Sequence, residues 1–288
     1  MASIKLIKRR IRSAENIAQI TRAMEMVAAS KMKKAQEEAV LGKPYADKIF
    51  QVTRELALKT DKKYHPLLSA GNPNGKTLIV LISTNKGLCG ALNTNLFRFC
   101  QNMFAADISF DYLTIGKKGQ NFAVKTGKSL IADFSDKTPF GESVPAITKI
   151  IVEGFINGTY KEIYLCFNSF INALKQTPVK KMILPIRYLE QNQNESNEIQ
   201  NEIFEFIIEP SIDDVLENLL PHYLENQIRS AIYESEASEQ SARMIAMKNA
   251  TDAAADLLSD LTLIFNKIRQ EKITYEIADM VTARLAIE

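Results

Sequence analysis

Hydrophobic residues recur at steps of three and four along the first part of the chain. These positions are Ile4, Ile7, Ile11, Ala14, Ile17, Ile20, Met24 and Val27. Alternating steps of this kind are typical of a helix that packs along a coiled-coil seam. After Val27 the stripe meets Lys31 and Lys34, and a second stripe continues from Ala28. We therefore predict an N-terminal coiled-coil helix over residues 1–58, interrupted at 41–44, where Gly and Pro disfavour a continuous helix.

Two stretches near the chain ends carry hydrophobic residues in nearly every helical direction. The first covers residues 24–32 and the second covers residues 273–287. A helix that is apolar all round is buried on all sides. Two paired helices cannot cover such surfaces by themselves, so the pattern predicts that other chains surround both stretches.

The pattern changes after residues 59–76, a segment rich in turn residues that we interpret as a linker loop. Short β-branched runs follow at 77–83, 110–116, 129–135 and 162–168, with helical stretches between them. This alternation predicts a parallel sheet covered on both faces, in an α/β domain over residues 77–210. Two more strands are expected at 179–186 and 203–210, separated by the polar segment 190–202.

The last segment, residues 211–288, is predicted to form a second long helix. Ser211 and Asp214 form a capping signal at its start, and Pro221 is expected to end or kink a short first helix. No Pro or Gly occurs from 222 to 287. The seam is expected at Ile228, Ile232, Ala242, Ile245, Leu257, Leu261, Ile264 and Ile268, with Asn249, Asp256 and Asp260 as polar interruptions.

The predicted fold class is α/β, with a long antiparallel coiled coil of the N- and C-terminal helices and an inserted Rossmann-like α/β domain. Charge supports the pairing of the two ends. Residues 1–34 hold nine Lys/Arg and two Glu, a net of +7, whereas residues 222–288 hold eleven Asp/Glu and seven Lys/Arg, a net of −4. Opposite charge on the two segments favours their association.

The cysteines and the hydropathy of the chain indicate where it works. Cys89, Cys100 and Cys166 are an odd number without metal-type spacing, which favours a reducing compartment. No apolar run approaches the roughly 20 residues that cross a bilayer. No secretory or organellar targeting segment is visible. We therefore expect a soluble cytoplasmic protein.

No convincing catalytic site is found in the sequence. The "KTGKS" at 125–129 lacks the earlier Gly of a phosphate-binding loop and runs into a strand. The "STNKGLCG" at 83–90 follows a strand and opens a helix, a context that suits anions, but a tight strand-to-helix turn is the favoured explanation. His65 and His222 have no partners at the spacing of a triad or a metal site. We expect no cofactor and no metal.

Four long motifs and two short ones resemble a known family, the gamma subunit or central rotor stalk of F-type ATP synthases. The long motifs are "ITRAMEMVAASKM" (20–32), "STNKGLCGALNTNLF" (83–97), "SEQSARMIAMKNATDAAADLL" (238–258) and "FNKIRQEKIT" (265–274). The "YHPLL" loop and the Glu209–Pro210 pair also match. The resemblance covers nearly the whole chain.

The resemblance implies a non-catalytic subunit that turns inside a ring of alternating alpha and beta subunits. Proton flow through the membrane c ring would drive the rotation, and the beta subunits would make ATP. The implied partners are the alpha, beta, epsilon and c-ring subunits, at the cytoplasmic face of the bacterial inner membrane. Nucleic acid is not an implied partner, and the membrane is reached only through the c ring.

Matching positions imply which residues meet these partners. Met24, Arg243, Gln270 and Thr274 match ring-contacting positions, and Glu209 matches the foot that meets the c ring. Tyr275 and Arg284 depart from the family pattern, so the contacts of the C-terminal tip are left open. Two alternatives also remain at this point: an α/β hydrolase or nucleotide-binding enzyme with helical extensions, and a scaffold coiled coil for an unrelated partner.

Overall fold

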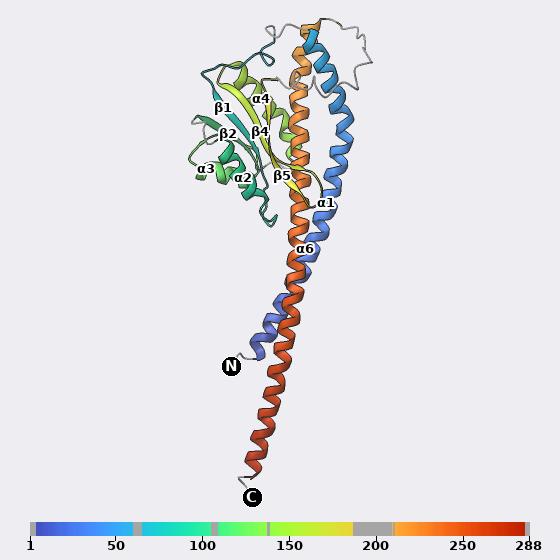
Figure 1. Cartoon of the computed structure of the whole chain (residues 1–288), viewed down its shortest axis with the longest axis vertical. Coiled ribbons are helices and arrows are strands. Elements are labelled where there is room, and N and C mark those ends of the chain that lie inside the picture. Colours follow the sequence, from blue (N-terminus) through green and yellow to red (C-terminus); the bar gives the residue numbers. More distant parts are fainter. Residues whose placement is uncertain are drawn as a thin grey trace. The chain divides into compact units, whose positions relative to one another are not determined.

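The computed structural model describes residues 4–59, 65–104, 109–136, 139–186, 209 and 211–285. The chain divides into two compact units. One unit combines Met1–Ser30 with Arg243–Glu288, and the other is Lys31–Ala242. Two long helices, α1 (Ile4–Lys59) and α6 (Ile212–Leu285), contribute to both units (Figure 1).

The larger unit is built on a five-stranded sheet. Its strands are β1 (Lys76–Ile82), β2 (Phe110–Ile115), β3 (Ser129–Asp133), β4 (Tyr160–Phe170) and β5 (Gln176–Leu184). They lie in the order β3-β2-β1-β4-β5. The first four pair in parallel, as predicted, whereas β5 runs antiparallel to β4 because a short hairpin joins them.

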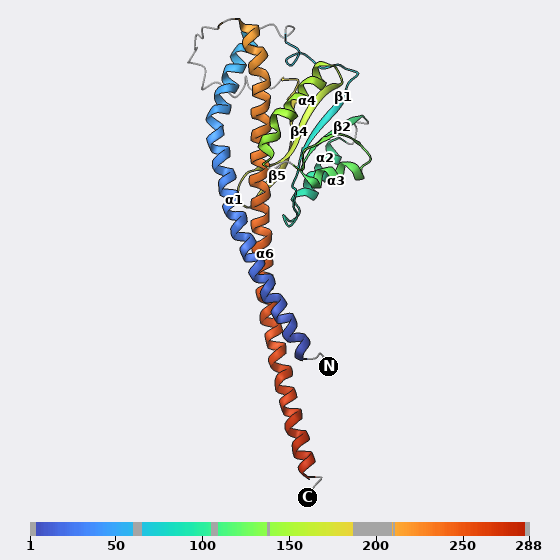
Figure 2. The same cartoon turned by 180° about the vertical axis from the view of Figure 1, so that it is seen from behind.

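Alternate residues of the central strand point to two separate cores. Leu78, Val80 and Ile82 lie in the core that includes α4 (Val144–Ile156), preceded by the short 3₁₀ helix η1 (Phe140–Ser143). Ile79 and Leu81 lie in the opposite core with residues of α2 (Leu92–Met103) and α3 (Lys117–Lys125). This two-residue period is what a strand buried on both faces requires. Figure 2, seen from behind, shows α4 on one side of the sheet and α2 and α3 on the other.

The first part of α6 belongs to the core of the larger unit. Leu216, Leu220, Leu224 and Ile228 are fully buried there and follow one another at steps of four, so they form one stripe of the helix. The sheet domain is therefore built around the beginning of the C-terminal helix.

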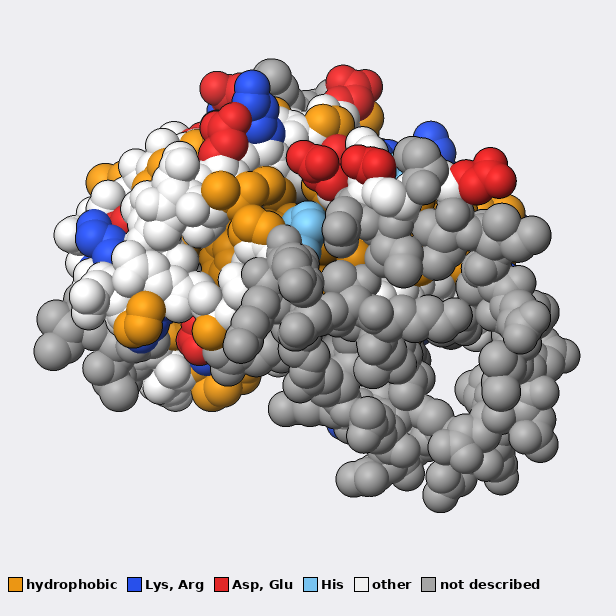
Figure 3. Space-filling view, turned by 90° about the horizontal axis from the view of Figure 1, so that it is seen from above, with side chains coloured by type: hydrophobic (Ala, Val, Ile, Leu, Met, Phe, Trp, Pro, Cys, Tyr) orange, Lys and Arg blue, Asp and Glu red, His pale blue; other side chains and the backbone are white. Residues whose placement is uncertain are grey.

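From above, hydrophobic side chains gather beside a histidine, with Asp and Glu side chains around them (Figure 3).

Two predicted helix interruptions are wrong. Gly42 and Pro44 lie inside α1, and Pro221 lies inside α6. A proline in a helix costs about 3 kcal/mol because it removes one hydrogen bond and clashes with the preceding turn. Packing on the larger unit outweighs this cost, since Ile49 and Leu56 on α1, like the leucines around Pro221, are buried in the same core.

The capping prediction is confirmed, since the backbone N–H of Asp214 donates to the Ser211 hydroxyl at 3.2 Å and that hydroxyl donates to the Asp214 carboxylate at 2.6 Å. The polar segment 190–202 and nearly all of the strand expected at 203–210 lie outside the described residues.

Candidate functional site: the paired terminal helices

The smaller unit is an antiparallel pair of helix segments whose register is marked by one hydrogen bond. Thr21 Oγ1 and Thr251 Oγ1 lie 2.7 Å apart. On α1 the buried residues in this unit are Ile7, Ala14 and Ala28, which are separated by seven and fourteen positions. On α6 the buried residues Met247, Ala254 and Leu261 follow the same spacing. A strict seven-residue repeat on both helices is the mark of a coiled coil.

The remaining seam positions follow by counting outward from the threonine pair. Each step along α1 matches a step in the opposite direction along α6, so Ile11 stands opposite Leu261 and Ile4 stands opposite Ile268. Ile268 is also the last described residue of α6 that is partly buried. The repeat of α6 therefore ends where the described part of α1 begins.

Part of the predicted seam is wrong. Ile17, Ile20 and Val27 are 51%, 60% and 56% exposed. The helix turns about 100° per residue, so the true seam steps from Ala14 through Thr21 to Ala28 and leaves the larger residues beside it. On α6, Leu257 and Ile264 are likewise exposed. The predicted polar interruptions, Asn249, Asp256 and Asp260, are also exposed and therefore do not break the seam.

The exposed hydrophobic residues of α1 form a stripe of their own. Leu6, Ile17, Ile20 and Val27 fall within about 80° of the helix surface, next to the seam. Met24 falls within the same arc and is partly buried. We call these five residues the apolar stripe. Between Leu6 and Ile17 the same arc carries Arg9 and Ser13, so the continuous part of the stripe runs from Ile17 to Val27. Apolar surface gathered on one helix face is typical of an interaction site.

The end of α6 is exposed on every side. All described side chains from Arg269 to Arg284 are open to solvent, among them Ile273, Ile277 and Met280. The described part of the second predicted apolar zone therefore lies on a helix segment that this chain does not cover.

The predicted ring-contacting residues fall into two groups along this unit. Met24 is partly buried, and Arg243 is only 8% exposed. Gln270 and Thr274 are exposed and lie one turn apart, with Thr274 Oγ1 donating to the Gln270 carbonyl at 2.9 Å. By the register, Met24 stands opposite Lys248, and Gln270 lies about 33 Å further along α6 at 1.5 Å per residue. The predicted foot residue, Glu209, is exposed and belongs to the other unit.

The turn after β1, whose sequence context suits anions, opens α2 and also receives the N–H groups at the start of α3. The three N–H groups at the start of α3 point to acceptors from this turn. Lys117 N–H donates to Asn85 Oδ1 at 2.9 Å, Lys118 N–H donates to the Thr84 carbonyl at 3.1 Å, and Gly119 N–H donates to Ser83 Oγ at 2.7 Å. The helix that the turn opens, α2, has Ala91 at its N-cap and no side-chain cap.

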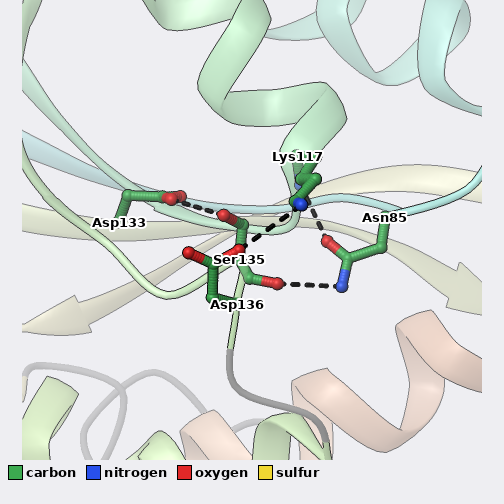
Figure 4. Close-up of polar contacts among 5 residues, drawn as sticks. All are labelled: Asn85, Lys117, Asp133, Ser135 and Asp136. Atoms are coloured by element: carbon green, nitrogen blue, oxygen red, sulfur yellow. Dashed lines mark hydrogen bonds and ion pairs between the residues drawn. The ribbon is translucent and has the colours of Figure 1, made fainter.

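Further side-chain bonds close the same edge of the sheet (Figure 4). Asn85 Nδ2 donates to the Ser135 carbonyl at 2.9 Å, and the Ser135 hydroxyl donates to the Asp133 carboxylate. Lys117 and Asp136 form an exposed ion pair at 3.4 Å. These contacts join the ends of β1, β2 and β3, which is a structural role.

The "KTGKS" segment has the opposite order to a phosphate-binding loop. Lys125 ends α3, Gly127 turns with a φ of +66°, and Ser129 begins β3. A phosphate-binding loop instead leads from a strand into a helix N-terminus.

Within the described residues, no helix has the length and hydropathy to cross a membrane.

A family model described as ATP synthase matches residues 3–287. The ATP synthase gamma chains of Leptothrix cholodnii and Dehalococcoides mccartyi are 36% and 40% identical to this chain, each with both sequences covered in full. The chain belongs to the ATP synthase gamma-chain family. The family resemblance found in the motifs is thereby confirmed.

Two solved structures share the fold. The first is a central stalk and c-ring structure of the Tetrahymena thermophila mitochondrial ATP synthase, with a TM-score of 0.59 and 24% sequence identity. The match covers 80% of this chain and 99% of the Tetrahymena chain. An OSCP/F1/c-ring structure from Euglena gracilis has a TM-score of 0.67 at 18% identity, and covers 99% of this chain and 94% of its own. The predicted fold class, with its two terminal helices and inserted α/β domain, is confirmed.

Proposed function

We propose that this chain is the central rotor shaft of an F-type ATP synthase. In this role it transmits torque between the membrane c ring and the catalytic alpha/beta ring during proton-driven ATP synthesis. The chain carries out no bond chemistry itself, and the beta subunits make ATP. Its partners are the alpha, beta, epsilon and c-ring subunits, and it is peripheral at the cytoplasmic face of a bacterial inner membrane.

One observation carries this proposal beyond family membership. The smaller unit exposes the apolar stripe on α1 and the hydrophobic residues at the end of α6, and its own helices leave both uncovered. A surrounding sheath of other subunits would bury them. Contacts of this kind are non-directional, because the hydrophobic effect depends on area rather than on geometry. They can be broken and made again as the shaft turns past each subunit.

The proposed contacts form two levels along the helix pair. Met24 and Arg243 contact the alpha/beta ring at one level, and Gln270 and Thr274 contact it at the other. Met suits a sliding contact because its side chain is flexible and polarisable. Glu209 contacts the c ring from the larger unit. A shaft held at two separated levels turns about its axis without tilting.

Assembly with its partners tests the proposal. The chain is co-expressed with the alpha and beta subunits of the same organism, and the complex is purified by a tag on beta. We expect a ring complex that contains one copy of this chain and hydrolyses ATP faster than alpha and beta alone. A chain that elutes by itself, with ATP hydrolysis unchanged, would contradict the proposal.

Calorimetry separates the proposal from an enzyme with a nucleotide site. ATP is titrated into the full-length chain. The proposed rotor role leads us to expect no saturable heat. Micromolar binding would favour the enzyme alternative instead.

A further inference from the structure

Four polar residues of α6 lie in one line and bond to the sheet of the larger unit. They are Gln227, Glu234, Ser238 and Ser241. Their directions fall within about 60° of one another at 100° per residue, and they span about 21 Å of helix. All four belong to the larger unit, together with the residues that they contact.

The first two contacts join α6 to β4 and β5 through side chains. Lys181 Nζ on β5 donates to Gln227 Oε1. Ser169 Oγ on β4 donates to Glu234 Oε2 at 2.8 Å. Burial lowers the pKa of Lys181, and the nearby Glu234 carboxylate acts in the opposite direction. The Lys181 ammonium group therefore lies at the helix–sheet boundary, bonded to Gln227 and near Glu234.

The next two contacts reach the backbone of β4 and of the β4–β5 hairpin. Ser238 Oγ donates to the Asn168 carbonyl at 2.9 Å, and Ser241 Oγ donates to the Ala173 carbonyl at 2.6 Å. Gln176 Nε2 adds a bond to Ser241 Oγ at 3.2 Å. Both serines are completely buried. Such hydroxyls are left without partners if the helix slides, and an unpaired buried polar group is costly.

These bonds supply what the neighbouring hydrophobic contacts lack. Leu224 and Ile228 anchor α6 in the core, but apolar packing by itself tolerates small displacements along the helix better than hydrogen bonds of fixed geometry do. These five bonds fix the position of α6 along its own axis and its rotation against the sheet. The same helix then continues without a break to Leu285.

We propose that the line Gln227–Glu234–Ser238–Ser241 is the mechanical coupling by which force on the α/β domain passes into the shaft helix. This inference rests on the proposed rotor function and assigns its transmission to positioning residues. Apolar packing holds the helix in place at rest, and the polar line holds its register under load.

The test compares loaded and unloaded turnover in the complete membrane-bound synthase. Ser238→Ala/Ser241→Ala removes two buried donors, and Ser230→Ala, an exposed serine of the same helix, is the matched control. Unloaded ATP hydrolysis by the detached alpha/beta/gamma complex should stay within about twofold of wild type. ATP-driven proton pumping in inverted vesicles should fall more than twofold for the double variant and stay at the wild-type level for Ser230→Ala.

Two further measurements keep the outcome decisive. Thermal unfolding of the double variant checks that the chain folds. Should it fail to fold, Gln176→Leu removes only a partly exposed partner of Ser241, and a partial loss of pumping is expected. Full pumping by a folded variant overturns the coupling role while leaving the rotor function intact. A wild-type chain that fails to assemble with alpha and beta overturns the rotor function itself.

Discussion

Glu236 lies on α6 within reach of charged side chains of both signs. Burial raises the pKa of this carboxyl above its ordinary value of 4.5, the carboxylates of Glu239 and Glu38 raise it further, and Lys31 and Lys34 oppose the shift. The folded chain therefore holds this proton more tightly than the unfolded chain does. Stability falls as the pH rises from about 4.5 through the folded pKa, because the charged form is disfavoured only in the folded state.

Replacing this carboxyl by an uncharged amide should stabilise the chain at neutral pH. We expect Glu236→Gln to raise the melting temperature at pH 7, with a gain that shrinks as the pH is lowered towards 4.5. Thermal unfolding of the full chain across this range measures the effect. Glu217→Gln, on an exposed part of the same helix, is the control for the substitution itself. A lower melting temperature for Glu236→Gln at pH 7 would show that its ion pairs outweigh desolvation.

A charge in the apolar stripe should disturb rotation rather than folding. Met24→Lys places an ammonium group on a surface that we propose to be enclosed by the ring, where an unpaired charge is costly. We expect an unchanged melting temperature of the isolated chain and less proton pumping per ATP hydrolysed by the complex. Ser30→Lys, exposed on another side of α1, should pump normally. Wild-type coupling in Met24→Lys would contradict its assignment to the ring contact.

Residue identity alone could not locate the seam. Apolar spacing correctly indicated a coiled coil, but it favoured Ile17 and Ile20 over the smaller Ala18 and Thr21. Whether a position lies in the seam is decided by the partner helix, and Thr21 gains a bond to Thr251 that only the pairing reveals. A search for strict seven-residue spacing of small residues would have found it.

The predicted contacts of Met24, Arg243, Gln270, Thr274 and Glu209 stay predictions, because they depend on other subunits.

At the scale of elements, the central strands were predictable and the helix breaks were not. The strands of the parallel sheet are short β-branched runs buried on both faces, so local pattern and tertiary setting agree. Pro44 and Pro221 break the local rule for helices. Pro221 lies between buried turns of the core, and Pro44 precedes Ile49 and Leu56 of the same core. This tertiary packing cannot be read from the neighbouring sequence.

Gly42 of α1 lowers the stability of the chain relative to an alanine there. Gly42 lies inside α1, and a Cβ added there would meet no atom within 4 Å. We expect Gly42→Ala to raise the free energy of unfolding by about 0.5–1 kcal/mol, because Ala restricts the unfolded chain more than Gly does. Chemical denaturation measures the gain.

Gly154→Ala is the control with the opposite expected sign. Its Cβ would approach the Tyr160 ring to 2.6 Å, so this variant should lose stability. A loss of stability in Gly42→Ala as well would indicate that α1 does not continue through this position.

At the scale of the whole molecule, the end of α6 contributes no described buried side chain to the chain's own fold. Ending the chain after Arg269 removes only residues whose described side chains are exposed. The free energy of unfolding of the isolated chain should therefore change by no more than about 0.5 kcal/mol. Ending it after Asn249 also removes Ala254 and Leu261 from the seam and should unfold the smaller unit. A large loss from the shorter truncation would mean that the tip packs on its own chain.

The seven-residue repeat of Ile7, Ala14, Thr21 and Ala28 has a mechanical corollary. Helices that keep this period wind about each other with a left-handed lay. Torsion in one direction winds such a pair tighter, and torsion in the opposite direction unwinds it. In the rotor role that we propose, the pair would be stiffer when turned in the tightening direction, and its torsional stiffness would therefore differ between ATP synthesis and ATP hydrolysis.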